Sequence, residues 1–184
     1  MKTRKMDGNK FNHKDKYKFF MEWVIPVILA VVTALLIKKF VLFNVYIPST
    51  SMAPTINAGD RIIVNRACNK NNIKRGDILL FYSNEFQETF IKRVIGLPGD
   101  TVVIKDGIVN INGEDIQEDY VKNNDYNNEK RIYEVPQGKY LFLGDNRAVS
   151  IDSRRWINPY IDEGDIKGKA VLKFYPISDF GSIH

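Results

Sequence analysis

The chain of 184 residues has a single cysteine, Cys68, and only two histidines, His13 and His184. One cysteine cannot form an internal disulfide, and it excludes a metal site built from a cluster of cysteines. The histidines lie in a polar N-terminal tail and at the last position, where a folded interior could not readily hold them. A Ser-His-Asp or Cys-His catalytic centre is therefore not expected.

The main part of the sequence also lacks an excess of positive charge, although the formal net charge is +5. Residues 1–42 carry nine Lys and Arg against three Asp and Glu, which leaves a net charge of −1 for residues 43–184. Because a polyanion needs a basic surface, we do not expect the main domain to bind nucleic acid. The length of 184 residues allows one folded domain and a short appendage, and the 44% of hydrophobic residues is enough to build a core.

The appendage is an uncharged apolar run at residues 23–37, followed by Lys38, Lys39 and further apolar residues. Its 15 residues fall short of the roughly 20 that cross a bilayer, so we expect the flanks to complete a transmembrane anchor at 23–42. A cleaved signal peptide fits less well, because the leading polar region is long and no small-x-small cleavage site follows. A buried core helix is another alternative.

The distribution of positive charge predicts how this anchor is oriented. Seven Lys and Arg precede the apolar run and two follow it directly. By the positive-inside rule, the tail at 1–22 is expected in the cytoplasm and the domain at 43–184 outside the cell membrane, which the chain would cross once.

Beyond residue 43, short runs of β-branched and aromatic residues replace the helical pattern. They lie at 61–65, 78–82, 89–95, 101–104, 108–111, 139–143 and 170–175. The pairs Asp106-Gly107 and Asn112-Gly113 predict hairpin turns, and the polar stretches at 69–74 and 122–131 are expected to be exposed loops. The sequence therefore predicts a mainly β fold with antiparallel strands.

With no usable histidine, serine is the obvious candidate nucleophile and a neutral lysine is its plausible base. A lysine ordinarily titrates at about 10.4, so it must be desolvated to serve. Lys92 stands in an apolar run, where alternation places it on one face with Phe90 and Val94. Taken alone, a lysine in a strand is more often a surface residue, so the run does not by itself identify a base.

A candidate nucleophile lies in the segment Ile-Pro-Ser-Thr-Ser-Met-Ala-Pro-Thr-Ile at 47–56. Structurally this segment could be only a proline-stiffened linker. It nevertheless resembles the nucleophile motif of type I signal peptidases, the membrane-anchored enzymes that remove signal peptides from exported proteins. The resemblance implies that Ser51 is the nucleophile, and that Ser49 donates its hydroxyl to an oxyanion hole completed by the Ser51 N–H.

Two more blocks of the sequence resemble this family, in the same order along the chain. Lys92-Arg93 followed by Gly-Leu-Pro-Gly-Asp at 96–100 is similar to the second family motif, and it implies that Lys92 is the general base. The resemblance covers the chain from the anchor to near the C-terminus. It implies a signal-peptidase-like antiparallel β domain with one N-terminal transmembrane helix.

The third block is Gly-Asp-Asn-Arg at 144–147 with Ser-Ile-Asp-Ser-Arg at 150–154. It implies that Ser150 supports the lysine by a hydrogen bond, and that Asp152 does so through a salt bridge to Arg154. Ala148 and Val149 replace the polar pair usual between these two stretches. We interpret that replacement as a surface change; the alternative is a change in how the block packs under the lysine.

The same resemblance implies the substrate, a signal peptide of a secretory preprotein that is cut after small residues and bound as an added strand. Segment 45–48 and residues 89–92 would flank it. The implied substrate-binding residues are Val45, Ile47, Pro48, Met52, Phe90 and Ile91, although ordinary core packing explains each of them equally well.

The region at 101–138 corresponds to a variable β insertion of the family. It is short here, and with a single anchor this resembles the compact form found in Gram-positive bacteria. We expect no metal and no cofactor, since Arg147, Arg154 and Arg155 lie near the carboxylates Asp145 and Asp152 and favour ion pairing.

Two other functions compete with a signal peptidase. Self-cleaving regulators share a Ser-Lys dyad on a similar fold, but they carry a DNA-binding region, and residues 1–42 contain no helix-turn-helix candidate. A catalytically silent relative could instead act as a membrane-tethered binding module. The presence of both Ser51 and Lys92 argues against that alternative.

Overall fold

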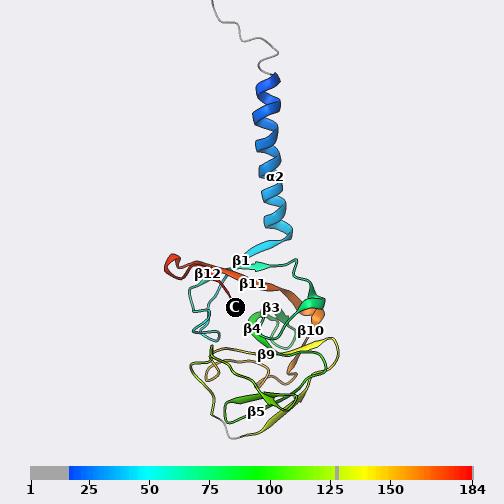
Figure 1. The fold of residues 1–184 in the computed structure, drawn as a ribbon, viewed down its shortest axis with the longest axis vertical. Coiled ribbons are helices and arrows are strands. Elements are labelled where there is room, and N and C mark those ends of the chain that lie inside the picture. Colours follow the sequence, from blue (N-terminus) through cyan, green and yellow to red (C-terminus); the bar gives the residue numbers. More distant parts are fainter. Residues whose placement is uncertain (1–16, 127–128, 184) are drawn as a thin grey trace, which may run out of the picture. The chain divides into compact units, whose positions relative to one another are not determined.

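The computed structural model describes residues 17–126 and 129–183 (Figure 1). The chain divides into two compact units, Met1–Phe40 and Val41–His184. The basic tail that underlies the predicted orientation lies mostly at 1–16, outside the described residues.

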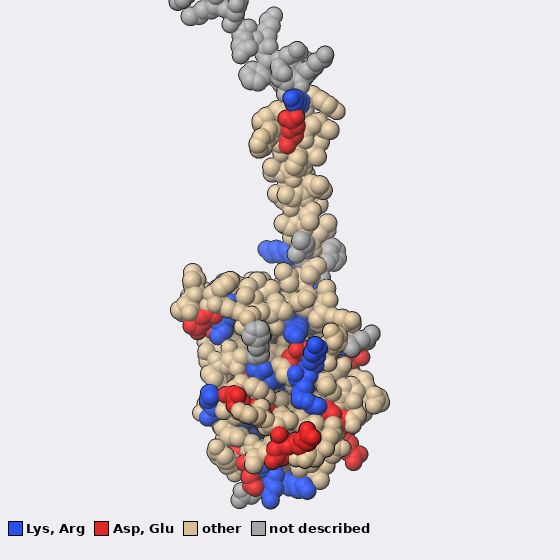
Figure 2. Space-filling view, in the orientation of Figure 1, with Lys and Arg blue, Asp and Glu red and all other residues tan. Residues whose placement is uncertain are grey.

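The first unit is a helix in which a π-helical segment, η1 (Phe20–Val24), leads into α2 (Ile25–Phe40). Pro26 has no N–H to donate, and its ring would clash with the carbonyl four residues earlier, which accounts for the widened turn just before it. Residues Tyr17–Leu36 are long and apolar enough to cross a membrane, and none of them is buried. Charged side chains are confined to the ends of this helix (Figure 2).

The second unit contains two sheets whose paired strands are all antiparallel, so the predicted fold class is confirmed. The larger sheet has the order β1-β2-β11-β3-β4-β9-β10, with β12 paired to β11. Its strands are β1 (Leu42–Tyr46), β2 (Arg61–Asn65), β3 (Ile78–Ser83), β4 (Glu88–Gly96), β9 (Lys139–Leu143), β10 (Tyr160–Asp162), β11 (Ile166–Tyr175) and β12 (Gly181–Ser182).

The smaller sheet has the order β7-β6-β5-β8 and falls within the region 101–138. Its strands are β5 (Thr101–Lys105), β6 (Ile108–Ile111), β7 (Glu114–Asp115) and β8 (Arg131–Glu134). Asp106-Gly107 and Asn112-Gly113 link β5 to β6 and β6 to β7, and all four residues have positive φ. Two central residues with positive φ form the hairpin turn that matches strand twist, so both turn predictions are confirmed.

Short 3-10 turns complete the second unit: η2 (Lys70–Asn72), η3 (Glu163–Asp165) and η4 (Ile177–Asp179). Charges of both signs are interspersed on the face of this unit seen in Figure 2.

Strand β4 contributes to all three clusters of the hydrophobic core. Ile91 packs in the first cluster, Ile95 in the second, and Val94 in the third with Phe90 beside it. The strand is buried from Ile91 to Gly96. Any polar side chain on this part of β4 is therefore held in a water-poor interior.

Candidate active site

Ser51 and Lys92 meet in the interior of the β unit, although 41 positions separate them in the chain. The Lys92 Nζ atom lies 2.5 Å from Ser51 Oγ. Ser49 Oγ lies 3.3 Å from Ser51 Oγ, so three polar atoms of the sequence-predicted site are grouped at one point. This is the spacing at which a base accepts the proton of a serine hydroxyl.

Burial changes the protonation of Lys92. The residue is only 3% exposed, and desolvation lowers its pKa from 10.5 to about 8, with Asp152 and then Asp145 opposing part of that shift. Its amine also lies 5.6 Å from the centre of the Phe90 ring, on the face predicted from alternation. An amine in this site is neutral in a substantial fraction of molecules near pH 8, as a general base requires.

The loop that carries Ser51 is joined to the 144–146 stretch by several hydrogen bonds. The Asn146 N–H donates to the Ser51 carbonyl at 3.1 Å, and Asn146 Nδ2 donates to the Thr50 carbonyl at 3.2 Å. Gly144 approaches so closely that a Cβ atom there would come within 2.5 Å of the Ser51 carbonyl oxygen and would overlap the Ser150 hydroxyl. Only glycine fits at this contact.

A buried ion pair holds the strand beside the lysine. Arg93, the next residue on β4, donates to Asp145 from Nε at 2.9 Å and from Nη2 at 2.7 Å. Thr55 Oγ1 donates to the same carboxylate at 2.6 Å. Strand β4, the nucleophile loop and the 144–147 stretch therefore meet at the Asp145 side chain.

The predicted salt bridge between Asp152 and Arg154 is confirmed, with Arg154 Nε and Nη2 each 2.9 Å from a carboxylate oxygen. Burial opposes the charge on Asp152, but the hydrogen bonds and charge of Arg154 outweigh it and keep the pKa of Asp152 below its usual value. The Gly144 N–H also donates to Asp152, at 3.0 Å.

Ser150 does not make the predicted hydrogen bond to Lys92. Its buried hydroxyl lies near enough to Asp152 to favour the ionised carboxylate, yet no hydrogen bond of standard geometry joins it to any described residue. The reason is local packing, because Ser150 abuts Gly144 while the lysine amine is directed at Ser51. Ala148 and Val149 are exposed, in agreement with a surface change.

The residues expected to bind substrate are mostly in or against one core cluster. Ile47, Met52 and Ile91 belong to it, with exposed fractions of 1%, 1% and 8%, and Val45 packs against it. Pro48 is exposed and Phe90 is half-buried. Most of the six residues expected to bind substrate are therefore close together, but Ile47, Met52 and Ile91 are buried rather than open to solvent.

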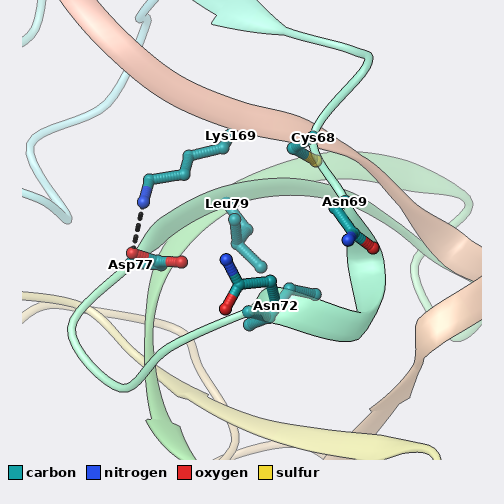
Figure 3. Close-up of a pocket in the computed structure, with 7 residues that line it drawn as sticks. Cys68, Asn69, Asn72, Asp77, Leu79 and Lys169 are labelled. Carbon is teal, nitrogen blue, oxygen red and sulfur yellow. Dashed lines mark hydrogen bonds and ion pairs between the residues drawn. The ribbon is translucent and has the colours of Figure 1, made fainter.

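A separate cavity of about 140 Å³ lies between β3, β11 and the η2 turn (Figure 3). Asp77 and Lys169 close one side of it with an ion pair of 2.5 Å. None of the predicted site residues lines it, although its Leu79 is the strand partner of Lys92.

The sequence analysis assigned no place in the site to Thr55, Arg93, Asp145 or Arg147. It expected Asp145 to pair with arginines close to it in the sequence, whereas its ion-pair partner is Arg93 and Arg147 pairs with Glu118. All four stand inside the motif blocks, so the available signal was a charged or hydroxyl side chain next to a predicted catalytic residue.

Comparison with known proteins identifies the family. A crystal structure of a signal peptidase I from Enterococcus faecalis V583 is 32% identical and covers 53% of this chain and 96% of its own, with a TM-score of 0.47. A signal peptidase I from Leptolyngbya laminosa is 41% identical over 89% of this chain and 83% of that protein. Another, from Bacillus licheniformis, is 37% identical over 90% of this chain and 94% of that protein. Residues 20–175 match the family described as signal peptidase, peptidase S26. On this match and the identities to the two relatives, the chain belongs to the signal peptidase family, peptidase S26.

Proposed function

We propose that this protein is a membrane-bound serine endopeptidase that removes N-terminal signal peptides from exported preproteins, with Ser51 as nucleophile and Lys92 as general base. Membership of the signal peptidase family supports signal-peptide removal, and the apolar N-terminal helix supports a membrane anchor. The observation that carries the dyad is the 2.5 Å contact between Lys92 Nζ and Ser51 Oγ at a lysine that is 3% exposed.

In the proposed reaction, neutral Lys92 accepts the Ser51 hydroxyl proton as Oγ attacks the scissile carbonyl carbon. The lysine ammonium then donates that proton to the leaving amine, and the C–N bond breaks to leave an acyl-enzyme ester on Ser51. A water molecule, deprotonated by the same lysine, hydrolyses the ester and restores the serine. Apart from the leaving amine of the substrate, only the dyad and water gain or lose a proton.

The negative charge of the tetrahedral intermediate needs hydrogen-bond donors placed before the reaction begins. We assign the Ser51 N–H and the Ser49 hydroxyl to this role. The 3.3 Å separation of the two serine hydroxyl oxygens supports it, because the oxyanion forms on the carbon that Ser51 Oγ attacks and so lies close to both hydroxyls.

Strand β4 offers an edge to which an extended signal peptide could be added. Its residues from Glu88 to Arg93 pair with β3, whereas β9 pairs only with Arg93, Val94 and Gly96. In the part of the chain that the structure describes, residues 88–92 therefore keep one backbone edge without a strand partner. Strand addition at this edge would bring a peptide to Lys92, and side chains of Val45, Pro48 and Phe90 would border it.

We assign a cytoplasmic N-terminus and an extracytoplasmic catalytic unit from the charge distribution around the helix. In this orientation the dyad lies on the side of the membrane where exported proteins emerge, as signal-peptide removal requires.

The test is cleavage of a secretory preprotein by the full-length protein in detergent, followed by sequencing of the new N-terminus. Ser51→Ala and Lys92→Ala should abolish cleavage, while Ser178→Ala and Lys105→Ala, at exposed positions, should leave it intact. Cleavage by wild type after a small residue, and loss in both dyad variants, would support the proposal. A folded wild type that binds signal peptide without cutting it would support the binding-module alternative and refute the peptidase.

A further inference from the structure

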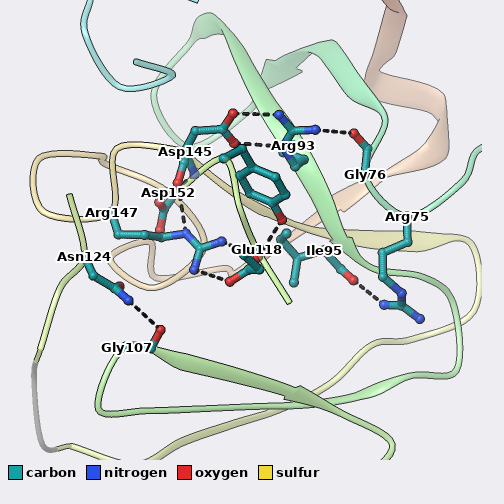
Figure 4. Close-up of polar contacts among 12 residues, drawn as sticks. Arg75, Gly76, Arg93, Ile95, Gly107, Glu118, Asn124, Asp145, Arg147 and Asp152 are labelled. Carbon is teal, nitrogen blue, oxygen red and sulfur yellow. Dashed lines mark hydrogen bonds and ion pairs between the residues drawn. The ribbon is translucent and has the colours of Figure 1, made fainter. Parts of the chain in front are cut away.

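One connecting segment, residues 116–126 between β7 and β8, contacts all three arginines of the second and third sequence blocks, which are Arg93, Arg147 and Arg154. Glu118 forms an ion pair with Arg147, the Tyr120 ring lies under Arg93, and Asp125 forms an ion pair with Arg154. The segment is also tied to the smaller sheet, because Asn124 Nδ2 donates to the Gly107 carbonyl at 2.8 Å (Figure 4). It therefore links the insertion to the site.

The Glu118 contact is buried and two-pronged. Arg147 Nη1 and Nη2 lie 2.8 Å and 2.5 Å from the two carboxylate oxygens of Glu118, and the side chains are 2% and 8% exposed (Figure 4). The remaining donor of the arginine, Nε, reaches the Gly144 carbonyl at 3.0 Å. Because Gly144 packs directly on the Ser51 carbonyl, three successive contacts, through Arg147 and then Gly144, connect Glu118 to the nucleophile loop.

Tyr120 links the same carboxylate to the strand of the lysine. Its hydroxyl donates to Glu118 Oε1 at 2.6 Å, and the Arg93 guanidinium carbon lies 3.9 Å from the centre of its ring. Burial, and next the Glu118 charge, raise the pKa of Tyr120, so its phenol stays protonated and remains a donor. The ring therefore fixes the arginine that directly follows Lys92.

Among the buried charged side chains around the dyad, positive and negative charges balance only when Glu118 is counted. Arg93, Arg147 and Arg154 face Asp145, Glu118 and Asp152 in three ion pairs whose side chains are all at most 8% exposed. The charged groups that act on Lys92 are Asp152 and Asp145 from the third block, and Asp145 is itself paired with Arg93, the next residue of the strand. With a neutral lysine these six buried side chains carry no net charge; Asp125, which also pairs with Arg154, is 32% exposed and is not among them.

We infer that Glu118 and Tyr120 are positioning residues for the Ser51–Lys92 dyad: they hold Arg147 and Arg93, and through them the Gly144 contact and the β4 strand. The inference rests on the proposed function for its kinetic consequence, but the geometry and the charge balance exist without it. Neither residue touches the reacting atoms, so both act through the arginines.

The variants that test this are Glu118→Gln and Tyr120→Leu, with Glu114→Gln and Tyr126→Leu as controls at exposed positions of the same region. In Glu118→Gln and Tyr120→Leu we expect kcat to fall on the order of tenfold or more with KM unchanged, the effect of a dyad displaced by a fraction of an ångström. Tyr120→Phe keeps the ring under Arg93 and should restore most of the activity.

The pH dependence separates positioning from a general loosening of the fold. Losing the Glu118 charge leaves the block one charge more positive, which disfavours the Lys92 ammonium, so the acid limb of kcat should move to lower pH in Glu118→Gln. A titration of Lys92 by NMR of the isotope-labelled amine, on the full-length protein in detergent, reads the same shift without any substrate.

Unchanged kcat and an unchanged acid limb in both variants, beside an active wild type, would overturn the inference and leave the proposed function standing. A Lys92 pKa that is higher in Glu118→Gln than in wild type would also overturn the inference, because it would mean that water has entered a loosened site. If wild type cuts no preprotein, the proposed function fails, and the NMR titration of wild type and Glu118→Gln alone decides whether Glu118 sets the state of Lys92.

Discussion

Protonation of Lys92 should control the rate of peptide cleavage between pH 7 and pH 9. A pKa lowered from 10.5 to about 8 corresponds to roughly 3 kcal/mol of disfavour for the buried ammonium relative to the neutral amine. The neutral fraction is then about one-tenth at pH 7, half at pH 8 and nine-tenths at pH 9. A lysine at 10.5 would be neutral in fewer than about one molecule in a thousand at pH 7. We therefore expect kcat/KM to rise roughly tenfold from pH 7 to pH 9 and then level off.

The assay is single-turnover cleavage of a peptide that spans a signal-peptide cleavage site, measured from pH 6 to pH 10.5 with full-length protein in detergent. Lys105→Ala, which removes an exposed lysine, is the matched control and should give the same profile as wild type. A rate that still climbs tenfold per pH unit between pH 9 and pH 10 would refute a desolvated Lys92. A flat profile from pH 6 to pH 9 would refute lysine as the base.

Three further variants report on other parts of the site. Ser49→Ala removes one oxyanion donor, so kcat should fall about 100- to 1000-fold in the cleavage assay and stay above that of Ser51→Ala. A fall to the Ser51→Ala level would contradict a role for Ser49 as one oxyanion donor alone. Lys92→Met removes an ammonium that is disfavoured at every pH below 10.5, so thermal unfolding at pH 7 should show stabilisation of up to about 3 kcal/mol that shrinks as pH rises from 8 to 10.5; equal gains at pH 7 and pH 10.5 would contradict the desolvation. Gly144→Ala should lower the free energy of unfolding by about 1–3 kcal/mol through overpacking, seen as a lower melting temperature, and should reduce kcat. Gly164→Ala, with no atom within 4 Å of the added Cβ, should change neither quantity. Equal effects of the two substitutions would refute the close contact at Gly144.

Much of the fold could be predicted from local sequence patterns. Strands such as 78–82 and 139–143 are rich in β-branched and aromatic residues, and the structure contains strands at both places. The shorter strands β7, β8, β10 and β12 have two to four residues and mixed polarity, so a local pattern could not reveal them. Strand β1 was missed for a different reason: it begins at Leu42, two residues after α2 ends, and its apolar residues merge with those of the helix.

The dyad could be predicted because each partner lies in a compact sequence block. What surrounds it could not, since the interpretation of 122–131 as an exposed loop was partly wrong. Asn124 and Asp125 are half-buried, and Asp125 contacts Arg154. The sequence likewise did not indicate a buried role for Glu118 and Tyr120. A carboxylate and a phenol in a polar stretch are usually exposed to solvent, and only the fold brings the arginines next to these two. Such long-range pairing has no periodicity to detect.

The neighbouring residues Lys92 and Arg93 show why one can be proposed as a base while the other needs a carboxylate. Arginine does not lose its proton in a protein, so each buried guanidinium must be paired, and Arg93 accordingly meets Asp145. Lysine can escape the same penalty by becoming neutral, and Lys92 faces a hydroxyl rather than forming a close ion pair. Buried ion pairs contribute little net stability compared with apolar packing. We therefore interpret the three ion pairs near Lys92 as contacts that position the residues of the site rather than as a source of stability. Each guanidinium fixes a backbone or side-chain neighbour of the dyad in a defined direction, while the lysine alone remains free to exchange a proton.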